Sequence, residues 1–193
     1  MTMKYEIVGK PYYPILRVSI EIGDRFFARL KSVFSFDVNT KWKEDKNDFH
    51  LFYVDTYSSE LLISSSIYGD ISYVDIAGQT LYVNSCALLA FHGDLTIDDK
   101  WGGAGEFFSD ERTYLLKITG KGGIFIRARG IIYKKWISST TFVNEENILA
   151  FEPSLNYKPY LLENDDRSFY VFDGGGNMYF QSRVLHHEKN DKK

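Results

Sequence analysis

The sequence predicts an all-β protein, and three observations support this prediction. One stretch of the chain recurs, because residues 81–95 and 141–155 are identical at six positions without a gap. Short runs alternate apolar and polar side chains at a period of two, which is typical of half-buried strands. No stretch sustains the longer period of about 3.6 residues that marks an amphipathic helix. A repeat at a fixed spacing also indicates a supersecondary unit that is copied along the chain.

A third and weaker copy of the repeated stretch lies near the N-terminus. Residues 26–36 align with the beginning of the 81–95 stretch, although fewer positions are identical. The alignment brings together Phe36, Phe91 and Phe151, which we expect to be buried at equivalent positions.

The repeats predict one continuous all-β domain over residues 1–185, with its units in a pseudo-threefold arrangement. The three tandem units span approximately residues 14–73, 74–137 and 138–185. The charged tail, residues 186–193, has no apolar side chains to pack and is expected to be disordered.

Strands are predicted in both halves of each unit. Before the first unit, residues 4–8 alternate until Gly9 and Pro11 break the pattern, and residues 15–22 follow with one apolar face. The second halves align as strands at residues 61–65, 124–128 and 178–182, each preceded by a strand at 52–54, 114–118 or 168–172. The polar or glycine-rich segments between them, residues 55–60, 120–123 and 173–177, are predicted to be short hairpin connections.

Two segments do not follow the unit. Residues 39–50 are predicted to form a charged, exposed loop or hairpin tip inside the first unit. Residues 92–113 are predicted to form a long loop that contains Trp101, Phe107 and Phe108, and such loops are often functional. These aromatic side chains either close one end of the barrel as a hydrophobic plug or form the candidate contact with a partner.

Composition limits the classes of function that are open to the chain. With 44% hydrophobic and 17% aromatic residues it can bury a substantial core, and a net charge of −3 gives no general attraction to nucleic acid. The single cysteine, Cys86, lies in an apolar part of the repeat and is expected to be a buried structural thiol. The sequence has neither an apolar signal segment nor a membrane-spanning apolar run, so a cytoplasmic location is expected.

The sequence lacks the residue spacings of a catalytic or metal-binding site. The four histidines do not show the His-x-His spacing with which strands hold a metal. The chain has no nucleophile elbow, and its glycine-rich segments lie between strands, whereas a phosphate-binding loop precedes a helix. We therefore expect no metal, no cofactor and no enzymatic activity.

One basic and aromatic cluster stands out in the second unit. Alternation places Phe125, Arg127 and Arg129 on one face of a strand, where they form a candidate nucleic-acid patch that would pair phosphates and stack bases. The other units have Ser64 and Gln181 in place of Arg127. The patch is therefore confined to one unit, and an ordinary solvated face is the alternative.

Short motifs along nearly the whole chain carry a family resemblance. They are residues 4–9, 14–18, 68–71, 101–103, 107–109, 115–120, 149–151 and 176–183. In this order they resemble the altered-inheritance-of-mitochondria protein 24 family, although that family has a glycine-rich insertion where this chain has the charged residues 39–50. The resemblance implies a TRAP-like double-stranded β-helix, with tandem units like those of the tryptophan RNA-binding attenuation protein. It also implies a prokaryotic cytoplasmic protein without established enzymatic activity; a mitochondrial relative is linked to inner-membrane organisation.

The leading hypothesis for function is a non-enzymatic binding or assembly module. Its partner is another protein or a second copy of the chain, because exposed edge strands can pair between subunits. One alternative is an RNA-binding TRAP-like module that uses Phe125, Arg127 and Arg129, which the net negative charge disfavours. The other is a small-molecule binder in the barrel interior, which the missing ligand residues disfavour. Similarity of fold to an RNA-binding protein does not by itself carry function.

Overall fold

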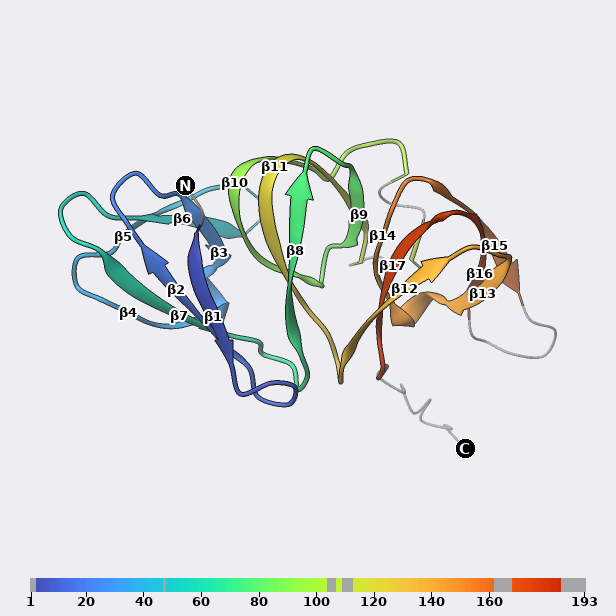
Figure 1. The fold of residues 1–193 in the computed structure, drawn as a ribbon, viewed down its shortest axis with the longest axis horizontal. Coiled ribbons are helices and arrows are strands. Elements are labelled where there is room, and N and C mark those ends of the chain that lie inside the picture. The colour runs from blue at the N-terminus through green and yellow to red at the C-terminus, as the bar shows by residue number, and fades with distance from the viewer. Residues whose placement is uncertain (1–2, 47, 104–106, 109–112, 162–167, 185–193) are drawn as a thin grey trace, which may run out of the picture.

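Strands form almost all of the regular structure of the protein. The computed structural model describes residues 3–46, 48–103, 107–108, 113–161 and 168–184. Within these residues there are seventeen strands and two single-turn 3-10 helices, η1 (Leu30–Ser32) and η2 (Glu145–Asn147). Figure 1 shows the strands in three groups that follow one another along the longest axis of the molecule. The prediction of an all-β protein is confirmed.

The first group lies at the N-terminal end of the row, in blue and cyan in Figure 1. Its strands are β1 (Lys4–Val8), β2 (Ile15–Ile20), β3 (Phe26–Arg29), β4 (Val33–Phe36), β5 (Lys41–Glu44), β6 (Phe49–Tyr53) and β7 (Ser59–Ser64). Among the described residues, β1 pairs only with β2, as an additional edge strand. β5 and β6 form the expected charged hairpin, and every residue of β5 is exposed.

The second group has fewer strands because two of them are long. Its strands are β8 (Ile71–Ala77), β9 (Leu81–Asn84), β10 (Leu88–Asp98) and β11 (Leu115–Arg127). The third group consists of β12 (Ile132–Ile137), β13 (Thr141–Asn144), β14 (Ile148–Phe151), β15 (Leu155–Leu161), β16 (Ser168–Gly174) and β17 (Gly176–Gln181).

The same pattern of antiparallel pairing occurs in all three groups. In the first group, β7 pairs with β2 and β4, and β6 pairs with β3 and β5. In the third group, β17 pairs with β12 and β14, and β16 pairs with β13 and β15. In the second group the two halves of β11 take these two roles: β9 and β8 pair with its first and second halves, and β10 pairs with both.

The strand register agrees with the alignment of the repeats. The aligned phenylalanines Phe36, Phe91 and Phe151 lie opposite Leu61, Ile124 and Met178, respectively. In each group a β-bulge falls between the residues three positions and one position before this phenylalanine. The expected burial is wrong for Phe36, whose side chain is 43% exposed, whereas the other two are buried. The difference arises because β4 has a paired neighbour on only one side.

The segments that the sequence predicts as hairpin turns are not hairpins. β6 does not pair with β7, and β16 does not pair with β17, so each connection carries the chain from one set of strands to the other. In the second group β11 continues without a break through Gly120, whose φ is +113°. A Cβ atom on Gly120 would lie 2.2 Å from the carbonyl oxygen of Asp94 in β10. Glycine therefore allows the strand to bend closely against its neighbour rather than to turn back.

Pairing between the groups produces a ten-stranded sheet that contains strands of all three groups, beside a four-stranded and a three-stranded sheet. At each junction one strand of a group pairs with one strand of the next group. β3 pairs with the start of β10 at the first junction, and β9 pairs with β14 at the second junction. Among the described residues, β4 and β13 have no strand on their outer sides. These two strands lie at opposite ends of the row (Figure 1).

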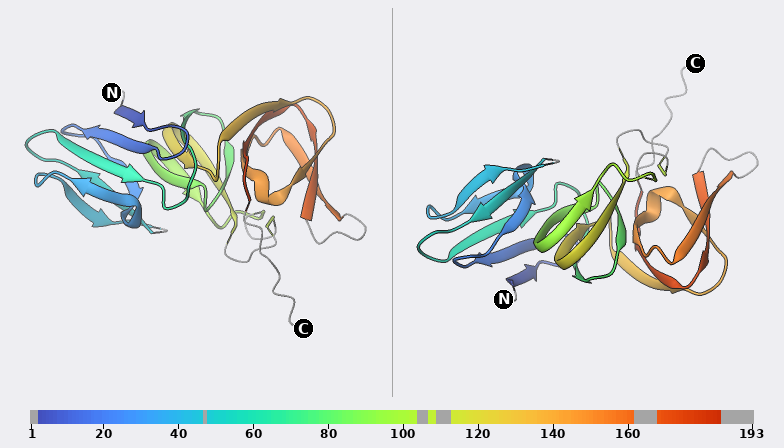
Figure 2. Two further views of the ribbon diagram at one scale, coloured as in Figure 1. Left: turned by 90° about the horizontal axis from the view of Figure 1, so that it is seen from below. Right: turned by 90° about the horizontal axis from the view of Figure 1, so that it is seen from above.

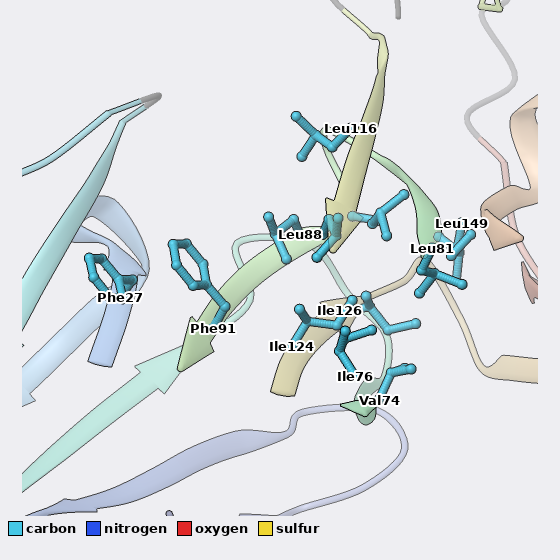
Figure 3. Packing of buried hydrophobic residues seen from close by; sticks show 14 of the residues in the cluster. Phe27, Val74, Ile76, Leu81, Leu88, Phe91, Leu116, Ile124, Ile126 and Leu149 are labelled. Atoms are coloured by element: carbon cyan, nitrogen blue, oxygen red, sulfur yellow. The ribbon is translucent and has the colours of Figure 1, made fainter. Parts of the chain in front are cut away.

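Buried apolar side chains form three clusters, and the largest extends across the first junction. In Figure 3, Phe27 from the first group faces Phe91 from the second. Their rings are stacked with centroids 4.6 Å apart. Ile124 and Ile126 of β11 continue the same cluster into the second group (Figure 3). The interior of the row is thus continuous from one group to the next.

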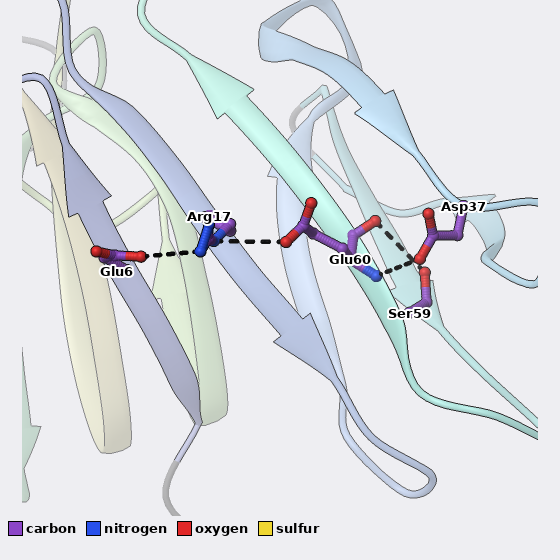
Figure 4. A network of polar contacts seen from close by, with 5 residues as sticks. All are labelled: Glu6, Arg17, Asp37, Ser59 and Glu60. Carbon is purple, nitrogen blue, oxygen red and sulfur yellow. Dashed lines mark hydrogen bonds and ion pairs between the residues drawn. The ribbon is translucent and has the colours of Figure 1, made fainter.

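Polar side chains hold β4 against its single neighbour. Asp37, which follows β4, accepts a hydrogen bond from the Glu60 amide at 2.8 Å. Arg17 forms ion pairs with the Glu60 carboxylate and with a glutamate of β1 (Figure 4). At the corresponding place after β14, Glu152 accepts a hydrogen bond from the Asn177 amide, also at 2.8 Å. The same side-chain contact therefore ends this strand in the first and third groups.

The arrangement of the groups differs from the expectation in two respects. Figures 1 and 2 show them in a row and not around a common axis. Grouped by pairing, the strands span residues 15–64, 71–127 and 132–181, so β8 and β12 begin before the expected divisions at residues 74 and 138. The tail at residues 186–193 lies outside the described residues.

Candidate interaction surface

The loop after β10 packs against the core of the third group. Trp101 lies flat on Tyr82, with ring centroids 4.4 Å apart, and its indole nitrogen donates a hydrogen bond to the Leu115 carbonyl at 3.0 Å. Phe107 is buried and stacks on Tyr170, with centroids 4.2 Å apart. The Tyr170 hydroxyl also donates a hydrogen bond to the Phe107 carbonyl. These contacts hold both aromatic side chains on the protein itself.

The candidate partner contact from the sequence is therefore largely covered. Phe108 packs edge-to-face on Phe107 at 4.8 Å, and it is partly buried in the same cluster, as is Trp101. This packing matches the plug interpretation of the loop. The expected loop is also shorter than residues 92–113, because β10 continues to Asp98.

The candidate nucleic-acid patch is not an exposed face. Phe125 is fully buried, and its ring meets Tyr5 edge-to-face at 5.0 Å. The expected alternation along β11 is present, since Ile124 and Ile126 lie in one core cluster and Phe125 in another. Sequence reasoning placed Phe125 in solvent because it could not foresee that the first group covers the second face of β11.

Arg127 is also buried, with 9% of its surface exposed. Its Nε donates a hydrogen bond to the Cys86 carbonyl at 2.9 Å, and its Nη1 donates one to Ser66 Oγ at 3.0 Å. Burial, together with the nearby charge of Arg29, lowers the pKa of the Arg127 guanidinium from its usual value. Of the three predicted residues, only Arg129 remains partly exposed. The structure therefore does not bring the patch together on the surface.

Cys86 is exposed, so the expectation of a buried thiol is wrong. The residue lies in the turn between β9 and β10, where the chain passes over the surface, and its sulfur is 3.8 Å from Thr113 Oγ1. The apolar residues around it in the sequence belong to the strands on either side, which are buried.

Burial changes the pKa of Tyr170, Tyr73 and His92. Burial raises the pKa of Tyr170 to about 12, and the Glu145 carboxylate acts in the same direction. Burial also raises the pKa of Tyr73 to about 12, and it lowers the pKa of His92, which stacks on that ring. Among the described residues, no three His, Cys, Asp or Glu side chains gather in a way that could hold a metal ion. No helix in that part of the chain is long and apolar enough to cross a membrane.

Exposed apolar side chains occur at many places on the surface, and those of β4 and β13 lie at the two ends of the row. At one end, Phe34 and Phe36 of β4 are 53% and 43% exposed. At the other, Phe142 of β13 is 55% exposed, and its ring packs on Tyr160 of β15 with centroids 4.9 Å apart. The residues of β10 and β14 that align with Phe34 and Phe36 are all buried. The alignment could have revealed these residues only with knowledge of which strands have neighbours.

The described residues define an all-β protein of three strand groups, with β4 and β13 among its edge strands. The family model for Mitochondrial biogenesis AIM24 matches residues 5–183, and the chain belongs to this family. The suspected family is thereby confirmed. No curated protein matches the sequence closely enough to count as a relative.

A solved structure has a similar fold. The chain is similar to the X-ray crystal structure of a Streptococcus pyogenes protein from a structural genomics consortium, with a TM-score of 0.79 and 16% sequence identity. The similarity covers 95% of this chain and 94% of that one. At this level of identity the likeness concerns the fold alone.

Proposed function

We propose that this protein is a non-enzymatic binding or assembly module of the cytoplasm, and that it contacts its partner through the two ends of the row. The observation that carries this proposal is the exposure of Phe34, Phe36 and Phe142 on strands that lack an outer neighbour. Unpaired edges with exposed apolar side chains are sites at which another chain adds a strand.

We further propose that the three groups are the tandem units of a TRAP-like, double-stranded β body. The recurrence of one pairing pattern, with a β-bulge at the same place in each group, supports this description. In such a body the units have the same backbone, and differences in function come from the side chains at their surfaces.

The two alternative functions have less support from the geometry. A small-molecule binder needs an enclosed cavity, whereas the pocket of about 330 Å³ beside Phe27 and Phe91 is partly open to the surface. An RNA-binding face built on Phe125 and Arg127 needs exposed side chains, whereas both are buried.

Photo-crosslinking in the native host tests the proposal. A photoreactive phenylalanine analogue replaces Phe36 or Phe142. The matched control carries it at Tyr68, which is 80% exposed and lies outside the strands, where its carbonyl accepts a hydrogen bond from the Gly130 amide. We expect discrete cross-linked protein products from the two end positions and none from the control position. The absence of products at both ends, or equal products at Tyr68, would overturn the proposal.

A further inference from the structure

The two junctions within the chain are built in the same way. At the first junction, Ala90 of β10 lies opposite Ala28 of β3. At the second junction, Ala150 of β14 lies opposite Val83 of β9. Each junction therefore places a small side chain of one strand against a small or β-branched side chain of the other.

An aromatic pair follows at the next position of each junction. Phe91 lies opposite Phe27 at the first, with the rings stacked 4.6 Å apart. Phe151 lies opposite Tyr82 at the second, and these rings meet at a steep angle with centroids 5.4 Å apart. Cross-strand aromatic pairs of this kind stabilise sheets beyond the area that they bury.

A side-chain hydrogen bond closes each junction. The residue that ends β3, Arg29, donates from Nε to the Leu88 carbonyl at 3.2 Å. The residue that ends β9, Asn84, donates from Nδ2 to the Ile148 carbonyl at 3.3 Å. Both acceptors are the first residue of the incoming strand, so the two bonds occupy the same place.

The free edges carry the two halves of such a junction. β4 corresponds to the incoming strand and presents Ser35 and Phe36 where β10 has Ala90 and Phe91. In contrast to the buried residues of β10, Phe34, Ser35 and Phe36 of β4 are all exposed.

β13 corresponds to the receiving strand. It presents Phe142 and Val143 at the places of Tyr82 and Val83, and it ends in Asn144 at the place of Asn84. The Asn144 side chain already accepts a hydrogen bond from the Glu146 amide, as the Asn84 side chain does from the Cys86 amide. Among the described residues, the side-chain nitrogen of Asn144, Nδ2, has no hydrogen-bond acceptor.

Among the described residues, every other edge strand contains a charged residue or a proline, and these two do not; β1 contains Lys4 and Glu6, and β8 contains Asp75. β15 contains Lys158 and Pro159, β5 contains Lys41 and Lys43, and β12 contains Lys134 and Lys135. Lysine and proline on an edge strand discourage the addition of another strand. β4 (Val-Phe-Ser-Phe) and β13 (Thr-Phe-Val-Asn) contain neither a charge nor a proline.

We propose that copies of this chain associate head to tail, with β13 of one copy pairing with β4 of the next as a third junction. Phe142 then lies opposite Phe36, Val143 lies opposite Ser35, and the Asn144 amide donates to the Val33 carbonyl. This inference rests on the proposed function, because it names a second copy of the chain as the partner at both ends. The contact is heterologous, so repetition produces a closed ring or an open filament, depending on the rotation between copies.

Charged substitutions at the two ends test both the contact and its polarity. Phe36→Lys blocks only the β4 edge, and Phe142→Lys blocks only the β13 edge, while Trp42→Lys on β5 is a control at a similarly exposed aromatic residue. In analytical ultracentrifugation over a range of concentrations, we expect the native chain and the control to associate. Each end variant alone is expected to sediment as a monomer.

A mixture of the two end variants gives the sharpest result. Each variant keeps one intact edge, and the two intact edges are complementary, so an equal mixture is expected to form a species of twice the chain mass and nothing larger. A symmetric contact between two β4 edges or two β13 edges would instead let one variant dimerise alone, and that result would overturn the inference.

A disulfide cross-link gives an independent measurement of the register. In a Cys86→Ser background, which removes the exposed native thiol, the Phe36→Cys, Phe142→Cys double variant is expected to form intermolecular disulfides under oxidising conditions. Phe36→Cys with Trp42→Cys is the matched control. A native chain that stays monomeric, or one whose association survives both end variants, contradicts the inference. Cross-links from the ends to a different protein would contradict it as well, but would leave the proposed function intact.

Discussion

Phe36 and Phe91 occupy the same register position in their strands but have different surroundings. Phe91 is 6% exposed and stacks on Phe27 across the first junction. Phe36 is 43% exposed, and its nearest ring contact is with Phe52, at 6.4 Å between centroids. The difference comes from the neighbouring group that covers one residue and is missing beside the other.

Truncation of these two side chains should therefore have unequal effects. Phe91→Ala is expected to lower the free energy of unfolding by about 3–5 kcal/mol, because it opens a cavity in the core. Phe36→Ala in the monomer should cost less than about 1 kcal/mol, since the side chain is largely in solvent. Chemical denaturation at a concentration that keeps the chain monomeric measures both. Equal losses for the two variants would contradict the assignment of Phe36 to a free edge.

The acidity of Tyr170 predicts how stability changes at high pH. The pKa of its hydroxyl is raised from 10.0 to about 12 in the folded chain, so folded chains keep this proton at pH values where unfolded chains lose it. The contribution is fully present below the unfolded value, and the free energy of unfolding falls as the pH rises from about 10 to about 12. Tyr73 acts in the same direction. Urea denaturation at a series of pH values should show a smaller decline in Tyr170→Phe than in the native chain; an identical decline would be evidence against this role.

At the scale of the strands, the sequence predicts which segments form strands better than it predicts how these strands are connected. The period-two runs located the strands that contain Leu61, Ile124 and Met178, and the register confirms that these residues are equivalent. The sequence alone favours hairpins at residues 120–123 and 173–177, because a local pattern of glycine is the same in a tight turn and in a bent strand. Gly120 serves the bend, and this depends on its contact with Asp94, a residue far away in the sequence.

The loop that contains Trp101 provides a test at the same scale. Trp101→Ala removes the stack on Tyr82 and the hydrogen bond to the Leu115 carbonyl, so we expect a loss of about 2 kcal/mol and a lower melting temperature. Trp136→Ala, at a residue that is 56% exposed, is the matched control and should have little effect. Association between chains should be unchanged in both. An unchanged melting temperature with altered association would favour the partner-contact interpretation of the loop.

At the scale of the whole molecule, the sequence could not show how the groups are placed. Equivalent residues such as Phe91 and Phe151 indicate that a unit is repeated, but they do not distinguish a row from a ring of units. Phe125 and Arg127 show the consequence: alternation along β11 was read correctly, yet the first group covers the face that was expected to meet solvent. Side chains at an interface between repeats can be assigned only when the neighbours are known.

The overall charge gives a prediction about nucleic acid. With a net charge of −3 and a buried Phe125 and Arg127, the chain is expected to show no tight RNA binding at physiological salt. Fluorescence anisotropy with labelled RNA over a range of salt concentrations measures this. Submicromolar affinity that falls steeply with salt and disappears in Arg129→Ala, a substitution at the partly exposed arginine, would revive the RNA-binding alternative.

The long pairing of β10 with β11 has a consequence for how the chain folds. These strands run side by side from Leu88 to Asp98 on β10, and the segment that joins them is short compared with the separations that bring β3 to β10 or β9 to β14. Closing the shorter loop costs less chain entropy, so this ribbon should form early and serve as the template on which the outer groups add their strands. We expect the amide protons of Ile124 and Ile126 to exchange with solvent more slowly than those of β4 and β13. Pulse-labelling hydrogen exchange during refolding should show protection there first.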